Sequence, residues 1–88
     1  MSDKEDIQKP NSDKIFTLAD EKYREGLKQD KNYRWGQAFW NTADDVFQKW
    51  YPELLDTFRE LKNTEFDCFF DNEKVLPLLG KIRELLKD

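Results

Sequence analysis

The clearest pattern in the chain is a separation of apolar and polar positions between Tyr33 and Tyr51. At roughly 100° per residue, the large apolar side chains of this stretch share one continuous arc. That arc comprises Trp35, Val46, Phe39, Trp50, Ala43, Gly36, Phe47, Trp40 and Tyr33. The opposite arc comprises Arg34, Gln37, Asn41, Asp44, Asp45, Gln48 and Lys49, with Ala38 as its apolar member. The pattern predicts an amphipathic helix whose aromatic stripe is covered by the rest of the chain.

Small residues refine this prediction. Gly36 and Ala43 lie seven positions apart in the apolar arc, and we expect them to let another helix pack closely. Ala38 falls on the polar side, so we expect it to be solvated. Asn32, just before the helix, is a residue type that favours the N-cap position.

Before this helix, residues 1–11 are mostly polar and end in Pro10-Asn11, which predicts a disordered N-terminal tail. Residues 12–88 are then a single helical domain. Its first helix is expected to begin near Ser12 or Asp13, either of which can serve as its cap, and to run to about Gln29.

Pro52 ends the aromatic helix and suits the first position of the next, which we expect to continue through Lys62. Asn63 is a residue that tolerates a left-handed C-terminal conformation. The stretch 63–73 has neither a helical nor a strand period and predicts an ordered loop pinned by Phe66, Phe69 and Phe70. A last helix follows, starting near Asn72 or restarting at Pro77.

Together these elements predict an all-α fold, a compact single-domain bundle of about four short helices with an ordered aromatic loop before the last helix. At 88 residues the chain is one small domain with a thin stability margin. Its 15% aromatic content partly compensates, because each buried ring removes a large area from water.

The residue inventory excludes several kinds of chemistry. The chain has no histidine and one cysteine, Cys68, so His-based catalysis, Cys-His nucleophiles and zinc or haem sites that need these residues are absent. We therefore expect no enzymatic activity and no cofactor. A lone cysteine is typical of a reducing compartment, and neither a secretion signal nor a membrane span is visible, so the expected location is the cytoplasm.

The net charge of −4 is unevenly distributed. Residues 38–73 carry nine acidic and three basic side chains, a net charge of −6, whereas residues 1–37 sum to zero and 74–88 to +2. Binding to nucleic-acid phosphates needs clustered Lys and Arg, so direct nucleic-acid binding is not expected. An acidic centre instead favours a basic protein partner. The chain itself is expected to be a monomer or a weak homodimer.

The first candidate interaction surface is the polar stripe Arg34, Gln37, Asn41 and Asp45. An arginine and two amides on one face could grip a carboxylate, a peptide backbone or a partner's polar edge. Alternatively, the stripe is a solvated face, or Arg34 ties the helix to the 63–71 loop. For such a tie, the loop carboxylates of Asp67 and Asp71 are the expected partners.

The loop carries four carboxylates, Glu65, Asp67, Asp71 and Glu73. Such groups can hold a divalent metal or act in glycosidases, but the spacing of a calcium loop is absent. Helix capping is the simpler interpretation of these side chains, and Asp67 and Asp71 remain site candidates. Cys68, beside an acid that raises its pKa, is expected to act as a small buried hydrophobe.

Trp50 and Tyr51, at the end of the aromatic stripe, are the ring residues most able to reach the surface, because Pro52 follows them directly. Aromatic side chains dominate interface hot spots, so these two complete the candidate interaction surface.

Two segments resemble a family of small, uncharacterised bacterial and phage proteins. Residues 34–41 (RWGQAFWN) resemble its R-[aromatic]-G-Q-x-[aromatic]-x-N motif, and residues 63–71 (NTEFDCFFD) resemble its G-T-x-x-D-P-F-x-D-like segment. The likeness covers roughly residues 33–79. Asn63 replaces the family's glycine and Cys68 its proline. The family has no established activity, so the resemblance implies a fold and an origin but no mechanism.

The leading hypothesis is a non-enzymatic protein–protein interaction or regulatory module of bacterial or phage origin. A second hypothesis is an acidic inhibitor or nucleic-acid mimic that blocks a basic groove of another protein. A third is a divalent-metal or small-ligand binder that uses the loop carboxylates.

Overall fold

The computed structural model describes residues 9–87, and within that range it contains four α-helices and no strand. The helices are α1 (Ser12–Gln29), α2 (Trp35–Trp50), α3 (Pro52–Arg59) and α4 (Val75–Leu86). A short 3₁₀ helix, η2 (Asn72–Lys74), leads directly into α4. The predicted all-α fold of about four short helices is confirmed. The prediction of a disordered tail falls mainly on residues 1–8, which lie outside the described residues.

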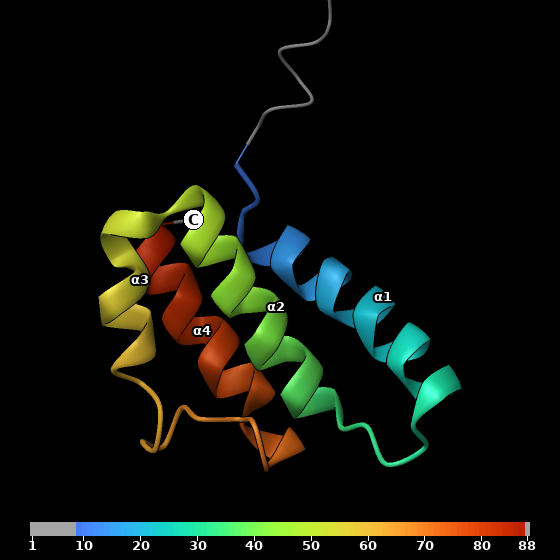
Figure 1. Ribbon diagram of the computed structural model, residues 1–88. Coiled ribbons are helices and arrows are strands. Elements are labelled where there is room, and N and C mark those ends of the chain that lie inside the picture. The colour runs from blue at the N-terminus through green and yellow to red at the C-terminus, as the bar shows by residue number, and fades with distance from the viewer. Residues whose placement is uncertain (1–8, 88) are drawn as a thin grey trace, which may run out of the picture.

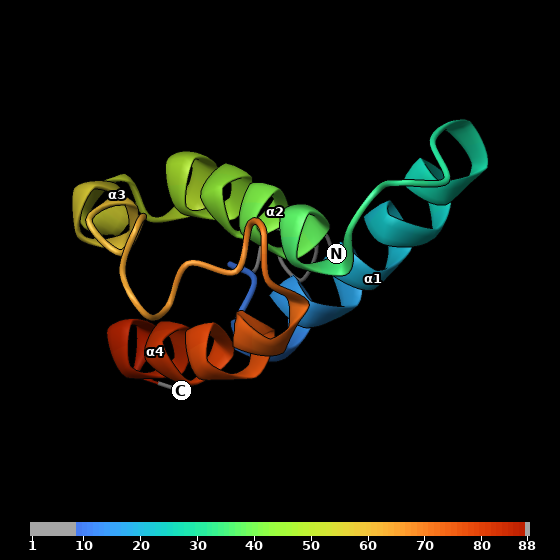
Figure 2. The ribbon, with the colours of Figure 1, turned by 90° about the horizontal axis from the view of Figure 1, so that it is seen from below.

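Helix α2 is the centre of the molecule. In Figure 1 it lies beside α1 on one side, with α4 and α3 on the other, and it contacts both α1 and α3. Figure 2, seen from below, shows α4 in a separate layer under α2, with the segment that joins α3 to η2 passing between them. Because α1, α3 and η2 all contact α2, the helix is covered on several sides.

The bounds of α1 agree with the prediction, but the residue that caps it differs. Asn11 is its N-cap, and the Asn11 side chain accepts a hydrogen bond of 2.8 Å from the Lys14 N–H. Ser12 and Asp13 hold α4 instead. The Arg83 Nε donates to the Ser12 hydroxyl at 3.3 Å, and the Arg83 guanidinium lies 3.2 Å from the Asp13 carboxylate. These contacts fix the C-terminal half of α4 to the beginning of α1.

The start of α2 also differs. The helix begins at Trp35 with Arg34 as its N-cap residue, and the Arg34 side chain does not cap it. Asn32 is not a cap, because it lies in the preceding turn, where its N–H donates to the Asp30 carboxylate at 2.9 Å. In the first turn, the Gly36 N–H has no carbonyl partner within the helix and donates to the Asn72 Oδ1 at 2.8 Å. Asn72 lies 36 residues further along the chain.

The buried arc of α2 is wider than its large apolar side chains indicate. Ala38, which the helical pattern assigned to the polar side, is only 1% exposed, and Thr42 is 5% exposed. The expectation that Ala38 is solvated is therefore wrong. The physical reason is that α2 is packed by neighbours on more than one side, so small side chains flanking the aromatic stripe are covered as well.

Helix α3 ends at Arg59, and turns carry the chain to Asn63. Asn63 has a φ of 68°, so its predicted left-handed conformation is confirmed. In the following loop Phe66 and Phe69 pack partly against the core, but Phe70 is 74% exposed and does not pin the loop as expected. Pro77 lies in the first turn of α4, where no intrahelical N–H bond is lost.

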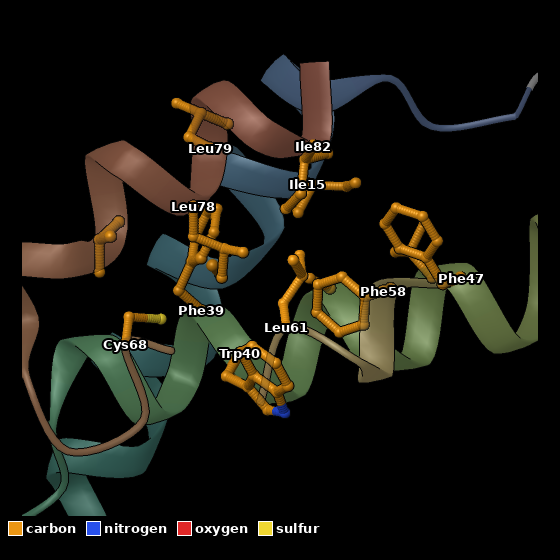
Figure 3. Close-up of a cluster of buried hydrophobic side chains, with 14 residues drawn as sticks. Ile15, Phe39, Trp40, Phe47, Phe58, Leu61, Cys68, Leu78, Leu79 and Ile82 are labelled. Atoms are coloured by element: carbon orange, nitrogen blue, oxygen red, sulfur yellow. The ribbon is translucent and has the colours of Figure 1, made fainter. Parts of the chain in front are cut away.

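The hydrophobic core joins all four helices and the loop (Figure 3). Its centre is a group of rings in which Phe58 of α3 packs against Trp40 and Phe47 of α2, with centroids 4.6 and 4.7 Å apart. The buried core residues are Ile15, Ala19, Phe39, Trp40, Ala43, Val46, Phe47, Phe58, Leu61, Cys68, Val75, Leu78, Leu79 and Ile82. Stability therefore depends on a few large rings, as expected for a small domain.

Candidate functional site

The predicted polar stripe runs along the solvent side of α2. Arg34, Asn41 and Asp45 are exposed and Gln37 is half-buried, at spacings of three and four residues that place them on one helix face. Figure 2 shows α2 and α4 in different layers of the molecule. The Asn41 amide and the Asp45 carboxylate are thus open to solvent, and the Gln37 amide is half-buried beside them.

At the N-terminal end of the stripe, Arg34 contacts the loop through Phe70. The Arg34 guanidinium donates to the Phe70 carbonyl oxygen at 3.4 Å, and its central carbon lies 5.9 Å from the centre of the Phe70 ring. Phe69 contacts the same ring edge-on, with centroids 4.8 Å apart. Phe70 is therefore exposed but held in position by two neighbours. We call Arg34, Phe70 and the stripe residues Gln37, Asn41 and Asp45 the α2–loop surface.

The loop carboxylates do not pair with Arg34, contrary to the expected tie. Asp67 accepts from the N–H of Asn63 at 2.8 Å with one oxygen and from the N–H of Phe69 at 3.0 Å with the other. Asp71 accepts from the N–H of Glu73 at 3.0 Å and is the N-cap residue of η2. Backbone N–H groups in the loop's own turns are the nearest donors. The interpretation of both carboxylates as local caps fits these contacts.

Beneath the loop, Cys68 and Asn72 enclose the first turn of α2. The Cys68 thiol donates to the Gly36 carbonyl oxygen at 3.2 Å, and Asn72 accepts from the Gly36 N–H. A Cβ at position 36 would collide with the Cys68 carbonyl oxygen. Gly36 therefore admits the loop backbone, whereas the expectation was that it admits another helix. This arrangement places the loop, and with it Phe70, next to Arg34.

Cys68 is fully buried, as expected for a small hydrophobe. Burial, with a smaller contribution from the charge of Asp67, raises the pKa of the Cys68 thiol from 9.0 to about 12. At neutral pH the thiol is therefore protonated, which makes it a poor nucleophile and lets it donate to Gly36.

Trp50 and Tyr51 lie at the other end of α2. Sixteen helical residues span about 24 Å, so these two rings are not part of the α2–loop surface. Both are half-buried. The Tyr51 hydroxyl donates to the Pro10 carbonyl oxygen at 2.7 Å, and the Lys9 ammonium lies 5.2 Å from the Tyr51 ring centre. Tyr51 thus holds the segment that leads into α1.

Between these ends, Asp44 forms the best-defined ion pair of α2. The Arg59 guanidinium of α3 donates to both Asp44 oxygens, at 3.0 and 3.1 Å. This bidentate contact holds the pKa of Arg59 above its usual value, first through the hydrogen bond and then through the charge of Asp44. The pair links α2 to α3 beside Asp45, the last residue of the stripe.

The sequence did not predict the positions of two side chains in this region, Phe70 and Asn72. Phe70 was expected to face inward, because nothing in the adjacent pair Phe69-Phe70 indicates which ring turns to solvent. For Asn72, the sequence predicted a position at the start of the last helix. Its residue type signals capping, but the helix that it caps lies 36 residues away in the chain.

The structure also bears on whether side chains of the chain could hold a metal ion and whether a helix could span a membrane. Among the residues that the structure describes, no three Asp, Glu or Cys side chains are grouped so that they could hold a metal ion. Within the same range, no helix combines the length and apolar character that a membrane crossing requires.

No family model matches this chain, and neither a curated protein nor a solved structure does. The resemblance to small bacterial and phage proteins stays a prediction, and the function is argued from the site alone.

Proposed function

We propose that this protein is a non-enzymatic, cytoplasmic interaction module of bacterial or phage origin that binds another protein through the α2–loop surface. One observation carries the proposal. Phe70 is 74% exposed, yet Arg34 and Phe69 hold its ring in place. Aromatic side chains and arginine are enriched in protein interfaces and their hot spots. A ring already held in position loses little conformational freedom on binding.

The surroundings of Phe70 favour a basic partner. Residues 38–73 carry a net charge of −6, and Asp45 and Glu73 are both exposed. A partner with Lys or Arg side chains would be attracted by this charge, and a cation could also lie against the free face of the Phe70 ring. The Gln37 and Asn41 amides add donors and acceptors for a partner's polar groups.

Affinity capture from the source organism, followed by mass spectrometry, tests the proposal when the wild type is compared with Phe70→Ala and Arg34→Ala. We expect the wild type to retain a basic protein that both variants lose, with affinity for the purified partner lower by at least about tenfold. The matched control is Leu76→Ala, which removes a large exposed apolar side chain on α4 and should retain the partner. If Phe70→Ala captures the same proteins as the wild type with equal affinity, the α2–loop surface is not the binding site.

A second candidate function is an acidic inhibitor or nucleic-acid mimic. Its support is a set of exposed carboxylates, from Glu53 and Asp56 of α3, Glu60 directly after it, and Asp45 of α2. A mimic would occupy the basic groove of its partner, so a DNA oligonucleotide should compete with the chain for the purified partner. Binding that DNA does not affect would favour the interaction module instead.

A further inference from the structure

Phe70 lies at the tip of a β-turn. The Asp71 N–H donates to the Cys68 carbonyl oxygen at 3.1 Å, which closes a turn over residues 68–71. Phe69 and Phe70 are its two central residues, and they differ in burial. Phe69 packs partly against the core, whereas Phe70 is 74% exposed. The Phe70 ring therefore projects into solvent from the 68–71 turn.

Both ends of this turn are attached to Gly36, in the first turn of α2. Cys68, the first residue of the turn, donates its thiol to the Gly36 carbonyl oxygen at 3.2 Å. Asn72, directly after the last residue, accepts from the Gly36 N–H at 2.8 Å. One residue of a helix thus fixes the chain on both sides of Phe70. A turn held in this way has little freedom, so little conformational entropy is lost when its tip is bound.

The charges beside the turn are mostly negative. Residues 63–73 contain four carboxylates and no Lys or Arg. The two Asp67 oxygens each accept from a backbone N–H, whereas Glu65 and Glu73 are exposed. Lys or Arg side chains of a partner that surrounds Phe70 would be attracted to these two glutamates.

We propose that the 68–71 turn inserts Phe70 into an apolar pocket of the protein partner, a pocket that fits a phenyl ring and has Lys or Arg at its edge. This inference rests on the function proposed above and names the kind of surface that the partner presents. A ring that projects from a turn needs a concave site to remove most of its area from water, because a flat surface covers one face only. Asn72 is a positioning residue, since its hydrogen bond to Gly36 holds the turn that carries the ring.

The positioning role is tested by NMR in the free protein. Asn72→Ala removes the acceptor of the Gly36 N–H, whereas Asn72→Asp keeps an oxygen there. We expect the wild type and Asn72→Asp to show contacts between the Phe70 ring and the Arg34 side chain, and Asn72→Ala to lose them. The matched control is Asn32→Ala, which should keep them, because the Asn32 hydrogen bond uses its backbone N–H. Contacts that persist in Asn72→Ala overturn the proposal.

The pocket is tested with the purified partner that the wild type captures. Phe70→Trp should weaken binding by at least about tenfold, because an indole ring is too large for a pocket that fits a phenyl ring. The matched control, Leu76→Trp, places the same large ring on the exposed side of α4 and should bind like the wild type. Asn72→Ala should weaken binding by about three- to tenfold, and Asn72→Asp should restore it.

These outcomes separate the two proposals. If no captured protein depends on Phe70, the function proposed above fails, and this inference fails with it. If a partner depends on Phe70 but binds Phe70→Trp as tightly as the wild type, or more tightly, its surface is flat and only the present inference fails. Wild-type affinity of Asn72→Ala has the same consequence.

Discussion

Phe39 and Phe70 show how differently the same side chain is used at two positions in this chain. Phe39 is fully buried and contacts the rings of Phe16 and Trp35, with centroids 6.2 and 5.9 Å away. Phe70 lies almost entirely in solvent against Arg34. One ring therefore contributes to stability, and the other is available for binding.

The first prediction compares these two rings. Phe39→Ala should lower the free energy of unfolding by about 3–5 kcal/mol, because it empties a fully buried site in a domain with little stability to lose. Phe70→Ala should change it by less than about 0.5 kcal/mol, since the ring is exposed. Thermal melts followed by circular dichroism measure both. A shift of only a degree or two for Phe39→Ala would contradict the assignment of the aromatic arc to the core.

Asp67 and Asp71 are alike in the sequence but differ in the number of hydrogen bonds that they accept. Asp67 accepts one on each oxygen, whereas Asp71 accepts one in all within the described residues. An asparagine side chain has a single oxygen, so it can replace Asp71 without losing a bond but cannot replace Asp67.

The second prediction follows from this difference. Asp67→Asn should destabilise the protein by about 0.5–2 kcal/mol in the absence of any ligand, the usual cost of a lost cap or hydrogen bond. Asp71→Asn, its matched control, should remain within about 0.5 kcal/mol of the wild type. Urea denaturation gives both values. If Asp67→Asn is more stable than the wild type, crowded like charges outweigh the caps, and the loop becomes a candidate binding site.

At the scale of elements, the junction between α2 and the loop depends on a glycine. The Gly36 N–H, carbonyl oxygen and Cα each meet the loop: the side chain of Asn72, the thiol of Cys68 and the backbone of Cys68 respectively. Gly80, in α4, meets nothing. Both are helical glycines, and intrinsic propensity favours alanine at either position.

The third prediction uses this contrast. Gly36→Ala should destabilise the protein by about 1–3 kcal/mol despite its better helix propensity, because the new methyl group forces the Cys68 backbone away. Gly80→Ala should stabilise the protein by about 0.5–1 kcal/mol. Chemical denaturation of both variants separates the two effects. Equal stabilisation by both substitutions would show that the loop does not press against α2.

The packing around α2 also determines which of its alanines can be replaced by a larger side chain. Ala38 was expected on the solvated side, but it is as deeply buried as Ala43, which is fully enclosed. We therefore expect both Ala38→Leu and Ala43→Leu to destabilise the protein, since added methylenes have no room at either position.

At the scale of the whole molecule, Cys68 links stability to pH. The thiol is enclosed where α2, the loop and the core meet, and its pKa is about 12 in the folded protein against 9.0 for an exposed thiol. Below pH 9 both states hold the proton, so the thiol adds no pH dependence. Above pH 9 the unfolded chain releases it first, and the folded state loses stability as pH rises toward 12.

The fourth prediction is a steeper alkaline loss of stability in the wild type than in Cys68→Ala. Between pH 9 and 11 the difference in slope should approach about 1.4 kcal/mol per pH unit, the contribution of one retained proton. Urea denaturation at a series of pH values measures it for both proteins. Other alkaline groups titrate in both, so parallel curves would mean that the thiol reaches solvent in the folded state.

The local pattern of the chain determined its helices. The bounds of α1, the break at Pro52 and the left-handed Asn63 follow from periodicity, proline geometry and the conformational range of Asn, which act within a few residues. The aromatic arc likewise identified the part of the core that α2 supplies, because one covered face imposes the helical period on the apolar positions.

The tertiary structure alone decided how these elements meet. The cap of α2 comes from Asn72, Arg34 contacts Phe70 where a carboxylate was expected, and Ala38 is buried because neighbours cover α2 on more than one side. The same long-range packing turns Phe69 inward and Phe70 outward. Each of these depends on contacts between residues tens of positions apart, and no local propensity encodes such contacts.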